Sequence, residues 1–260
     1  MGTLLDIRNA CFAFEDQRLI FDKVNFTVEK GDLFTILGPN GSGKSTLLNC
    51  IANVYSLKRG KIILDGQDID RLAPNQIAQR IAYLPQSYQV AYGFSVREFI
   101  VMGRAPHLGM FSKPSQQDYR LADDTMALMN LTHFAHKAVT QISGGERQLV
   151  SIARAIVQQP ELILFDEPTS ALDYGNQLRV LRLIKRLSGE GYAVIMTTHN
   201  PDHPILLGGR AGVLSRNGHM ETGPVGEILQ QQRLSELYGI KMQIVYVNEI
   251  ARYACVPESL

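Results

Sequence analysis

A glycine-rich stretch near the N-terminus, "GPNGSGKST" (residues 38–46), has the residue types and the spacing that bind a polyphosphate. It follows the apolar run "LFTIL" and precedes "LLNCIA", so the pattern G-x-x-x-x-G-K-[ST] stands between a strand and a helix, as that motif requires. Gly41 and Gly43 let backbone N–H groups turn toward phosphate oxygens, while the helix N-terminus adds positive potential. Lys44 is expected to reach the β and γ phosphates, and Ser45 to ligate Mg²⁺. The predicted nucleotide contacts are Gly38, Pro39, Asn40, Gly41, Ser42, Gly43, Lys44, Ser45 and Thr46.

Two adjacent acids, Asp166 and Glu167, follow the apolar run "LILF" (162–165). Ligands and catalytic groups of an open α/β sheet are expected at such a strand end. In phosphoryl transfer one carboxylate holds the metal, and a second orients and deprotonates the attacking water. We therefore expect Asp166 to hold Mg²⁺ through a water molecule and Glu167 to be the general base. The alternative is a pair of acids that merely begins a solvated loop.

A second candidate phosphate cradle lies about a hundred residues later, in "TQISGGERQLVSIARA" (140–155). Its Ser-Gly-Gly turn opens an amphipathic helix, whose N-terminus suits an anion. One chain with a complete phosphate loop has no evident need of this second turn.

The motifs stand in the order found in the nucleotide-binding subunits of ATP-binding cassette (ABC) transporters, and the chain resembles that family over nearly its whole length. "ISGGE" is similar to the family signature "LSGGQ", with Ile142 and Glu146 substituted. "SALD", ending at Asp173, is similar to the D-loop that follows the strand acids. Gln86 in "AYLPQS" is similar to the glutamine that senses Mg²⁺ and the transmembrane partner, and His199 in "MTTHN" to the switch histidine.

The resemblance implies an ATPase that works as a pair. In the family, the signature turn serves the ATP held by the partner subunit, so Ser143, Gly144, Gly145 and Glu146 would complete a site in trans. Two copies would then associate head to tail around a two-fold axis.

Two departures from the family pattern bear on that site. Glu146 puts a negative charge near a triphosphate unless it points away or pairs with Arg147 or Arg154. Phe14 in "CFAFED" stands where the family usually has Tyr, so stacking on adenine is retained without a hydroxyl contact. The alternative for Phe14 is a core aromatic on a strand, because aromatics favour strands.

The segment "YGFSVREFIVMGRAPHLGMFSKPSQQD" (92–118) resembles the ATPases of importers for iron-siderophore complexes, haem and cobalamin, with molybdate or tungstate carriers close by. The resemblance implies that permease subunits dock at about residues 87–114, with a substrate-binding protein involved indirectly. The candidate contacts are Val101, Met102, Leu108, Met110 and Phe111, with Arg104 as a polar one. About half of these are expected to pack within the segment instead.

The elements that must position these residues follow from hydrophobic pattern. Continuous apolar runs at 33–37, 162–165 and 193–198 predict parallel strands covered on both faces, whereas alternation at 24–28 and 61–66 predicts an antiparallel layer. Asn217-Gly218 predicts a hairpin. We expect an α/β protein with the P-loop ABC ATPase fold, a mixed sheet core, an antiparallel β subdomain and an inserted helical subdomain. The expected division is 1–86 with 160–241 as catalytic core, 87–159 as helical segment and 242–260 as a C-terminal hairpin.

Composition narrows the function classes. The 260 residues are 45% hydrophobic, enough for a substantial core, and 26 Lys+Arg against 25 Asp+Glu leave a net charge of +1. This balance argues against nucleic acid as a partner and against direct binding to an anionic membrane. No run approaches the length of a membrane span, so we expect a peripheral protein at the cytoplasmic face of the inner membrane, bound through its permease.

Three alternatives compete with this interpretation. A soluble ABC protein of translation or repair would usually carry two cassettes or a coiled coil, and this chain has one cassette and no heptads. A nucleotide-dependent interaction module without turnover would not need Glu167 and His199. A zinc site at His199 and His203 is disfavoured because Pro201 and Pro204 interrupt the helix that such spacing requires.

Overall fold

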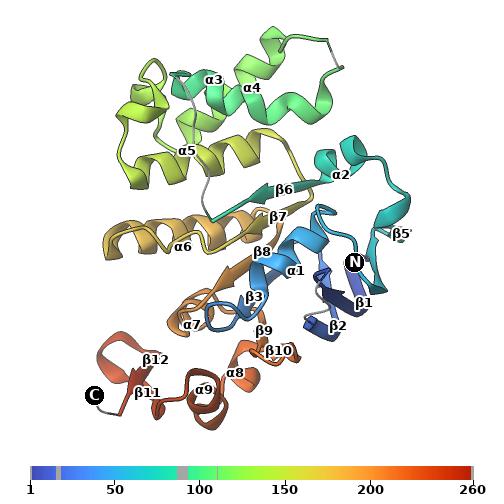
Figure 1. Cartoon of the computed structure of the whole chain (residues 1–260). Helices are drawn as coiled ribbons and strands as arrows, with labels where there is room; N and C mark the ends of the chain where they lie inside the picture. Colours follow the sequence, from blue (N-terminus) through green and yellow to red (C-terminus); the bar gives the residue numbers. More distant parts are fainter. Residues whose placement is uncertain (1, 16–18, 87–92, 110, 259–260) are drawn as a thin grey trace.

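A six-stranded sheet forms the centre of the protein (Figure 1). The computed structural model describes residues 2–15, 19–86, 93–109 and 111–258. The strand order is β10-β9-β3-β8-β7-β6, and all neighbours are parallel except β10, which pairs antiparallel with β9. The strands are β3 (Leu33–Leu37), β6 (Ile81–Leu84), β7 (Leu162–Phe165), β8 (Ala193–Thr198), β9 (Arg210–Leu214) and β10 (Met220–Pro224). The three apolar runs predicted as parallel strands are confirmed as β3, β7 and β8.

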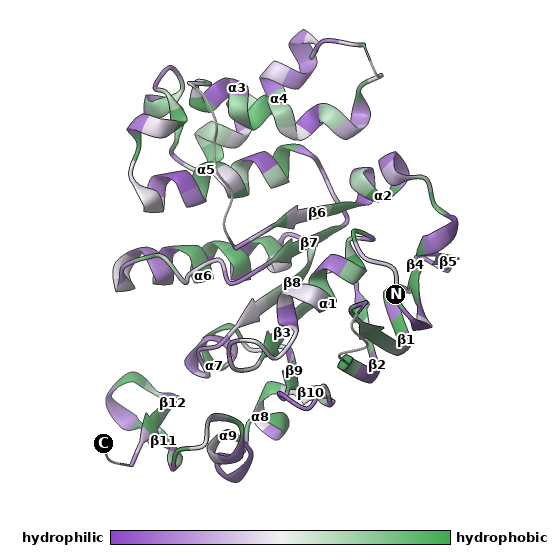
Figure 2. Cartoon of the chain, in the orientation of Figure 1, coloured by the Kyte–Doolittle hydropathy of each residue, from purple (hydrophilic) through white to green (hydrophobic). Residues whose placement is uncertain are grey.

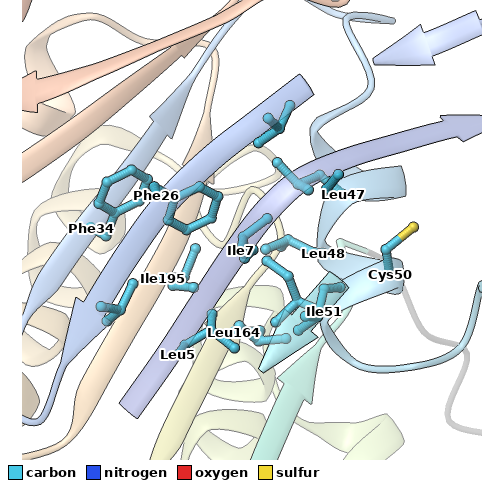
Figure 3. Packing of buried hydrophobic residues seen from close by; sticks show 14 of the residues in the cluster. Leu5, Ile7, Phe26, Phe34, Leu47, Leu48, Cys50, Ile51, Leu164 and Ile195 are labelled. Carbon is cyan, nitrogen blue, oxygen red and sulfur yellow. The ribbon is translucent and has the colours of Figure 1, made fainter. Parts of the chain in front are cut away.

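An antiparallel sheet of order β2-β1-β4-β5 covers one side of this core. Its strands are β1 (Thr3–Ala13), β2 (Leu19–Glu29), β4 (Arg59–Leu64) and β5 (Gln67–Asp68). Helix α1 (Lys44–Ile51) packs in the apolar cluster that both sheets contribute to, and the rings of Phe26 and Phe34 stack across it with centroids 4.5 Å apart. Figure 3 shows this cluster, where Leu5 and Ile7 meet Leu47, Leu48, Ile51, Leu164 and Ile195. The packing fixes where α1 begins, and therefore where the phosphate loop lies.

Two amphipathic helices, α5 (Gly144–Val157) and α6 (Tyr174–Gly189), pack in a second cluster against the central strands. Ile163, Val194 and Met196 belong to this cluster, whereas their strand neighbours Leu164 and Ile195 belong to the first. The strands are apolar throughout because both of their faces are covered. Figure 2 shows the hydrophilic and hydrophobic residues alternating along α5 and α6.

A helical segment follows β6 and lies at the top of Figure 1. It contains α3 (Val96–Val101), α4 (Gln116–Leu128) and α5, with short 3-10 turns at Met102–His107, Thr132–Phe134 and Val139–Gln141. Ser95, Ser115 and Ser143 each cap one of the three helices, paired with an acid three residues later. Each of the three helices therefore begins at a defined residue.

The C-terminal part adds small elements at the opposite end of the molecule (Figure 1). They are α7 (Asp202–Leu207), α8 (Val225–Ile228), α9 (Gln231–Tyr238), β11 (Met242–Val247) and β12 (Arg252–Pro257), with a 3-10 turn at Asn248–Ile250. Strands β11 and β12 form an antiparallel hairpin, and a β hairpin also joins β9 to β10 around Asn217-Gly218. Near β4 and β6 lie a 3-10 turn at Ile69–Arg71 and α2 (Pro74–Arg80). None of the described helices has the length and apolar character needed to cross a bilayer.

Candidate functional site

The phosphate loop joins β3 to α1. Gly43 is the N-cap of α1 with φ of 99°, a left-handed conformation that favours glycine. The Lys44 side chain is 4% exposed, and its Nζ donates to the backbone carbonyls of Gly38 at 2.9 Å and Pro39 at 3.1 Å. Ser42 Oγ is buried without a hydrogen-bond partner in the described structure. A buried ammonium and an unpaired hydroxyl in one loop fit the oxygens of a phosphate chain.

The strand ends bring the two acids to this loop. Ser45 Oγ donates to Asp166 Oδ1 at 2.9 Å, although the residues are 121 positions apart. The hydroxyl of Thr197, on β8, donates to Asp166 Oδ1 at 2.7 Å and accepts the N–H of Glu167 at 2.9 Å. The adjacent hydroxyl and carboxylate oxygens of Ser45 and Asp166 are ligands of the kind that Mg²⁺ prefers, so these residues fit a magnesium site.

Glu167 lies at the centre of the cluster. Its backbone has φ of 44°, which is unusual for a residue other than glycine, and its side chain is buried. Lys44 Nζ lies 3.0 Å from Oε1, and His199 Nδ1 lies 2.9 Å from Oε2. Burial by itself would raise the pKa of Glu167, but the hydrogen bonds and charges of Lys44 and then His199 outweigh it and lower that pKa. Glu167 is therefore an ionised carboxylate at neutral pH.

The remaining residues predicted for the site lie around this cluster. His199 directly follows β8 and leaves 47% of its side chain exposed. Gln86, after β6, donates from Nε2 to Ser170 Oγ at 3.4 Å. Asp173 caps α6 by accepting the N–H of Asn176 at 2.9 Å, and this hydrogen bond is the main reason its pKa is lowered. Their roles toward ATP stay predictions.

The signature turn begins α5 and is capped from within. Ser143 is the N-cap, and Glu146 folds back so that its Oε2 accepts the N–H of Ser143 at 2.7 Å. The backbone and side-chain hydrogen bonds of Ser143 lower the pKa of Glu146. The carboxylate is thus used in a capping box, which accounts for the negative charge at this position. These hydrogen bonds join Ser143 and Glu146 to each other and do not involve the phosphate loop of the same chain.

A comparison with known protein families shows to which family the chain belongs. A sequence profile described as "ABC transporter" matches residues 21–170. The chain belongs to the ABC transporter family. ATP-binding subunits of this family are ATPases, so the chain is an ABC-type ATPase that binds ATP.

Individual relatives are similar in sequence to this ABC ATPase over most of its length. It is 35% identical to the molybdate import ATP-binding protein MolC of Haemophilus influenzae, covering 93% of this chain and 90% of that one. It is 32% identical to the iron(3+)-hydroxamate import ATP-binding protein FhuC of Bacillus subtilis, covering 94% and 91%. A solved metal-chelate type ABC transporter in an inward-facing conformation superposes with a TM-score of 0.89 at 34% identity, covering 100% and 98%. The predicted ABC ATPase fold is therefore confirmed.

Phe14 is the predicted adenine contact of the ABC site. It lies one residue beyond β1, is 44% exposed, and packs edge to face on Phe12 at 5.1 Å. The alternative of a core aromatic on a strand is wrong, because the ring stands at the surface. Sequence reasoning missed Tyr55, which follows α1, is 40% exposed and lies 6.3 Å from Phe14 between ring centroids.

The residues predicted to meet a permease divide into two groups. Val101 and Arg104 are buried, and Arg104 donates to Asp118 Oδ1 at 2.9 Å and to the carbonyl of Val157 at 3.0 Å. They belong to the half that packs inside the helical segment, so their assignment as docking contacts is corrected. Met102 and Phe111 are exposed, the latter at 95%, and Leu108 is partly exposed. Met110 lies outside the described residues.

Sequence reasoning also missed the two threonines before the switch histidine. Thr197 bridges the acids, and the fully buried Thr198 Oγ1 lies 2.8 Å from Nδ1 of His203 while accepting the N–H of Asn200. Polar residues at the end of the apolar run "AVIMTT" were the available signal. His203 thus points at Thr198, and α7 begins only at Asp202, so His199 lies outside that helix.

Proposed function

We propose that this chain is the ATP-binding and ATP-hydrolysing subunit of an ABC importer, which energises uptake of a metal chelate such as an iron-siderophore complex, haem or cobalamin. The observation that carries the proposal is the pairing of Glu167 with both Lys44 and His199 at the ends of three parallel strands. This set has a phosphate-binding cation, a base and a residue that orients the base. Import of metal chelates is supported by FhuC and by the superposed transporter.

Molybdate or tungstate is the second candidate for the cargo. The relative MolC is named for molybdate import and is 35% identical, slightly more than FhuC at 32%. The cargo of an importer does not touch the ATPase, so the residues of this chain favour neither class of cargo.

The proposed chemistry starts with an exchange at Lys44. ATP offers phosphate oxygens to Lys44 Nζ, which in the present arrangement lies 3.0 Å from Glu167 Oε1. Glu167 Oε1 is then free to accept a proton from the attacking water, while His199 remains on Oε2. Ser45, Asp166 and Gln86 would hold Mg²⁺, which neutralises charge on the β and γ phosphates when bound. Phe14 would stack on the adenine.

We further propose that two copies act as a head-to-tail pair. The signature turn of one copy, Ser143 to Glu146, would complete the ATP site of the other by adding backbone N–H groups, a hydroxyl and the N-terminus of α5. The pair would bind the permease through the exposed surface near Met102 and Phe111, at the cytoplasmic face of the inner membrane. A substrate-binding protein on the other side would deliver the cargo.

Coexpression with the membrane subunits encoded beside this chain tests the proposal. We expect a detergent-stable complex with vanadate-sensitive ATPase activity, and uptake by the reconstituted system of one of the candidate chelates or oxyanions. Purification without any membrane protein, together with association with ribosomes or DNA, would show instead a soluble ABC ATPase. Transport assays with each chelate and with molybdate then separate the two cargo classes.

A further inference from the structure

The backbone of the switch histidine is held by a residue from the C-terminal part of the chain. Tyr238, the last residue of α9, donates its hydroxyl to the carbonyl of His199 at 2.7 Å. A second link lies beside it, where the N–H of Cys255 on β12 donates to Asp202 Oδ1 at 2.9 Å. Tyr238 and Cys255 both lie beyond residues 21–170, which the family profile matches. Figure 1 shows α9 and the β11–β12 hairpin at the same end of the molecule as α7.

Helix α9 is itself anchored in the core, so Tyr238 does not stand on a free tail. Leu234 is fully buried in a cluster with Leu37, Ala211 and Val213, and Tyr238 packs against this cluster. Leu37 is the residue immediately before the phosphate loop. The helix ends at Gly239 in a left-handed conformation, with φ of 70°, which fixes the position of the preceding tyrosine. Helix α9 therefore connects the base of the phosphate loop to the switch histidine.

The side chain of His199 has few constraints of its own. It is 47% exposed, whereas Thr198 just before it is held in the sheet by pairing with Leu37. Tyr238 therefore holds the His199 carbonyl, which is the first one after the end of β8. Burial, followed by the nearby Cys255 and Glu167, raises the pKa of Tyr238, so its hydroxyl keeps the proton that it donates. The hydrogen bond fixes the peptide from which the imidazole reaches Glu167 at 2.9 Å.

We propose that Tyr238 is a positioning residue for ATP hydrolysis, which acts by holding the His199 carbonyl so that the imidazole stays on Glu167. The inference rests on the proposed role of His199 in hydrolysis. The Tyr238 hydroxyl is directed at His199 and not at the phosphate loop, so its loss affects the chemical step and not the binding of ATP.

The test is Tyr238→Phe in the full-length protein, which keeps the ring in the apolar cluster and removes only the hydroxyl. We expect kcat to fall about 3- to 10-fold, the effect of one hydrogen bond, with KM for ATP unchanged. Tyr253→Phe is the matched control, since Tyr253 is an exposed tyrosine of the same C-terminal part whose ring packs on Tyr246. We expect this control to keep the wild-type kcat, and both variants to remain folded at the assay temperature, with Tyr238→Phe losing no more stability than one hydrogen bond provides.

A second comparison isolates the route through the histidine. The single variant His199→Ala and the double variant that combines His199→Ala with Tyr238→Phe should have the same single-turnover rate, because Tyr238 acts only through His199. A wild-type kcat in Tyr238→Phe, or an equal fall with and without His199, would overturn the inference. Hydrolysis by His199→Ala at the wild-type rate would overturn the proposed role of His199 instead, so the two failures are distinguishable.

Discussion

At the scale of single residues, the hydroxyl of Thr197 organises both acids. It donates to Asp166 and accepts from the backbone of Glu167, and it is completely buried. A buried group left without its partner costs about 1–3 kcal/mol. This hydroxyl therefore holds the Asp166 carboxylate in a fixed orientation relative to the backbone of Glu167.

Thr197→Val should lower kcat for ATP hydrolysis by about 10-fold or more, because Asp166 and the N–H of Glu167 each lose a partner at nearly constant volume. Thr35→Val on β3 is the matched control, since Thr35 Oγ1 is buried without a hydrogen-bond partner among the described residues. That control should keep wild-type activity. Steady-state ATPase assays compare the two, and equal activity in both variants would show that the bridge is unimportant.

Glu167→Gln should retain ATP binding and lose hydrolysis by about 10²-fold or more, because an amide cannot accept the proton of the attacking water. ATP affinity should not fall, since Lys44 loses a carboxylate that competes with phosphate for its Nζ. Equilibrium nucleotide binding and ATPase assays measure the two effects. Turnover at the normal rate would remove Glu167 as the base.

At the scale of elements, α7 carries a histidine that is buried in its neutral form. Burial, followed by the charge of His199, lowers the pKa of His203 from 6.5 to about 4. The unfolded chain therefore binds a proton first as the pH falls below 6.5, and the folded state loses stability down to about pH 4. This loss amounts to at most about 1.4 kcal/mol per pH unit from one group.

His203→Gln should flatten the fall in unfolding free energy between pH 6.5 and pH 4 relative to the wild type. His136→Gln is the control, because His136 is exposed on the helical segment. Urea unfolding at several pH values gives both slopes. If His203→Gln and the wild type lost stability in parallel, the neutral burial of His203 would not be a source of acid sensitivity.

The helical segment depends on a buried ion pair between Arg104 and Asp118. Hydrogen bonds from Ser115 and then from Arg104 lower the pKa of Asp118 to about 2, so the pair stays charged at neutral pH. Arg104→Met leaves that buried carboxylate without its cation, although its hydrogen bonds from Ser115 remain, and should destabilise the protein by about 3 kcal/mol. The control is Arg186→Met, which breaks an exposed i, i+4 pair with Glu190 and should cost about 0.5 kcal/mol.

Denaturant unfolding decides between this structural role and the surface role that the sequence suggested. If Arg104→Met kept full stability but failed to bind the permease, Arg104 would be a docking residue after all.

At the scale of the whole molecule, a site completed by two copies predicts that two inactive variants can complement each other. Gly144 is exposed, and a Cβ added there meets nothing within 4 Å, so Gly144→Asp should fold while placing a charge against the phosphates of the other copy. Lys44→Ala disables the phosphate loop. Each variant alone should be inactive, but a mixed pair contains one site with an intact phosphate loop and an intact signature.

Mixing the two variants should therefore restore ATPase activity well above the sum of the separate preparations. The control replaces Gly144→Asp with Gly226→Asp, another glycine with open space around it, which should be active before mixing. Absence of any recovery after the subunits exchange would indicate that each copy completes its own site.

The division of the chain into catalytic core, helical segment and terminal hairpin stays a prediction.

The sequence by itself predicted the phosphate loop and the central parallel strands β3, β7 and β8. Local spacing was enough for the phosphate loop, because its glycines, lysine and serine are consecutive, and for β3, β7 and β8, because burial on both faces leaves an unbroken apolar run. Only the tertiary structure showed that Lys44 and His199 share Glu167, that Arg104 is internal, and that Tyr238 reaches His199. These contacts join residues distant in the chain, and hydrophobic periodicity carries no information about which side chains meet.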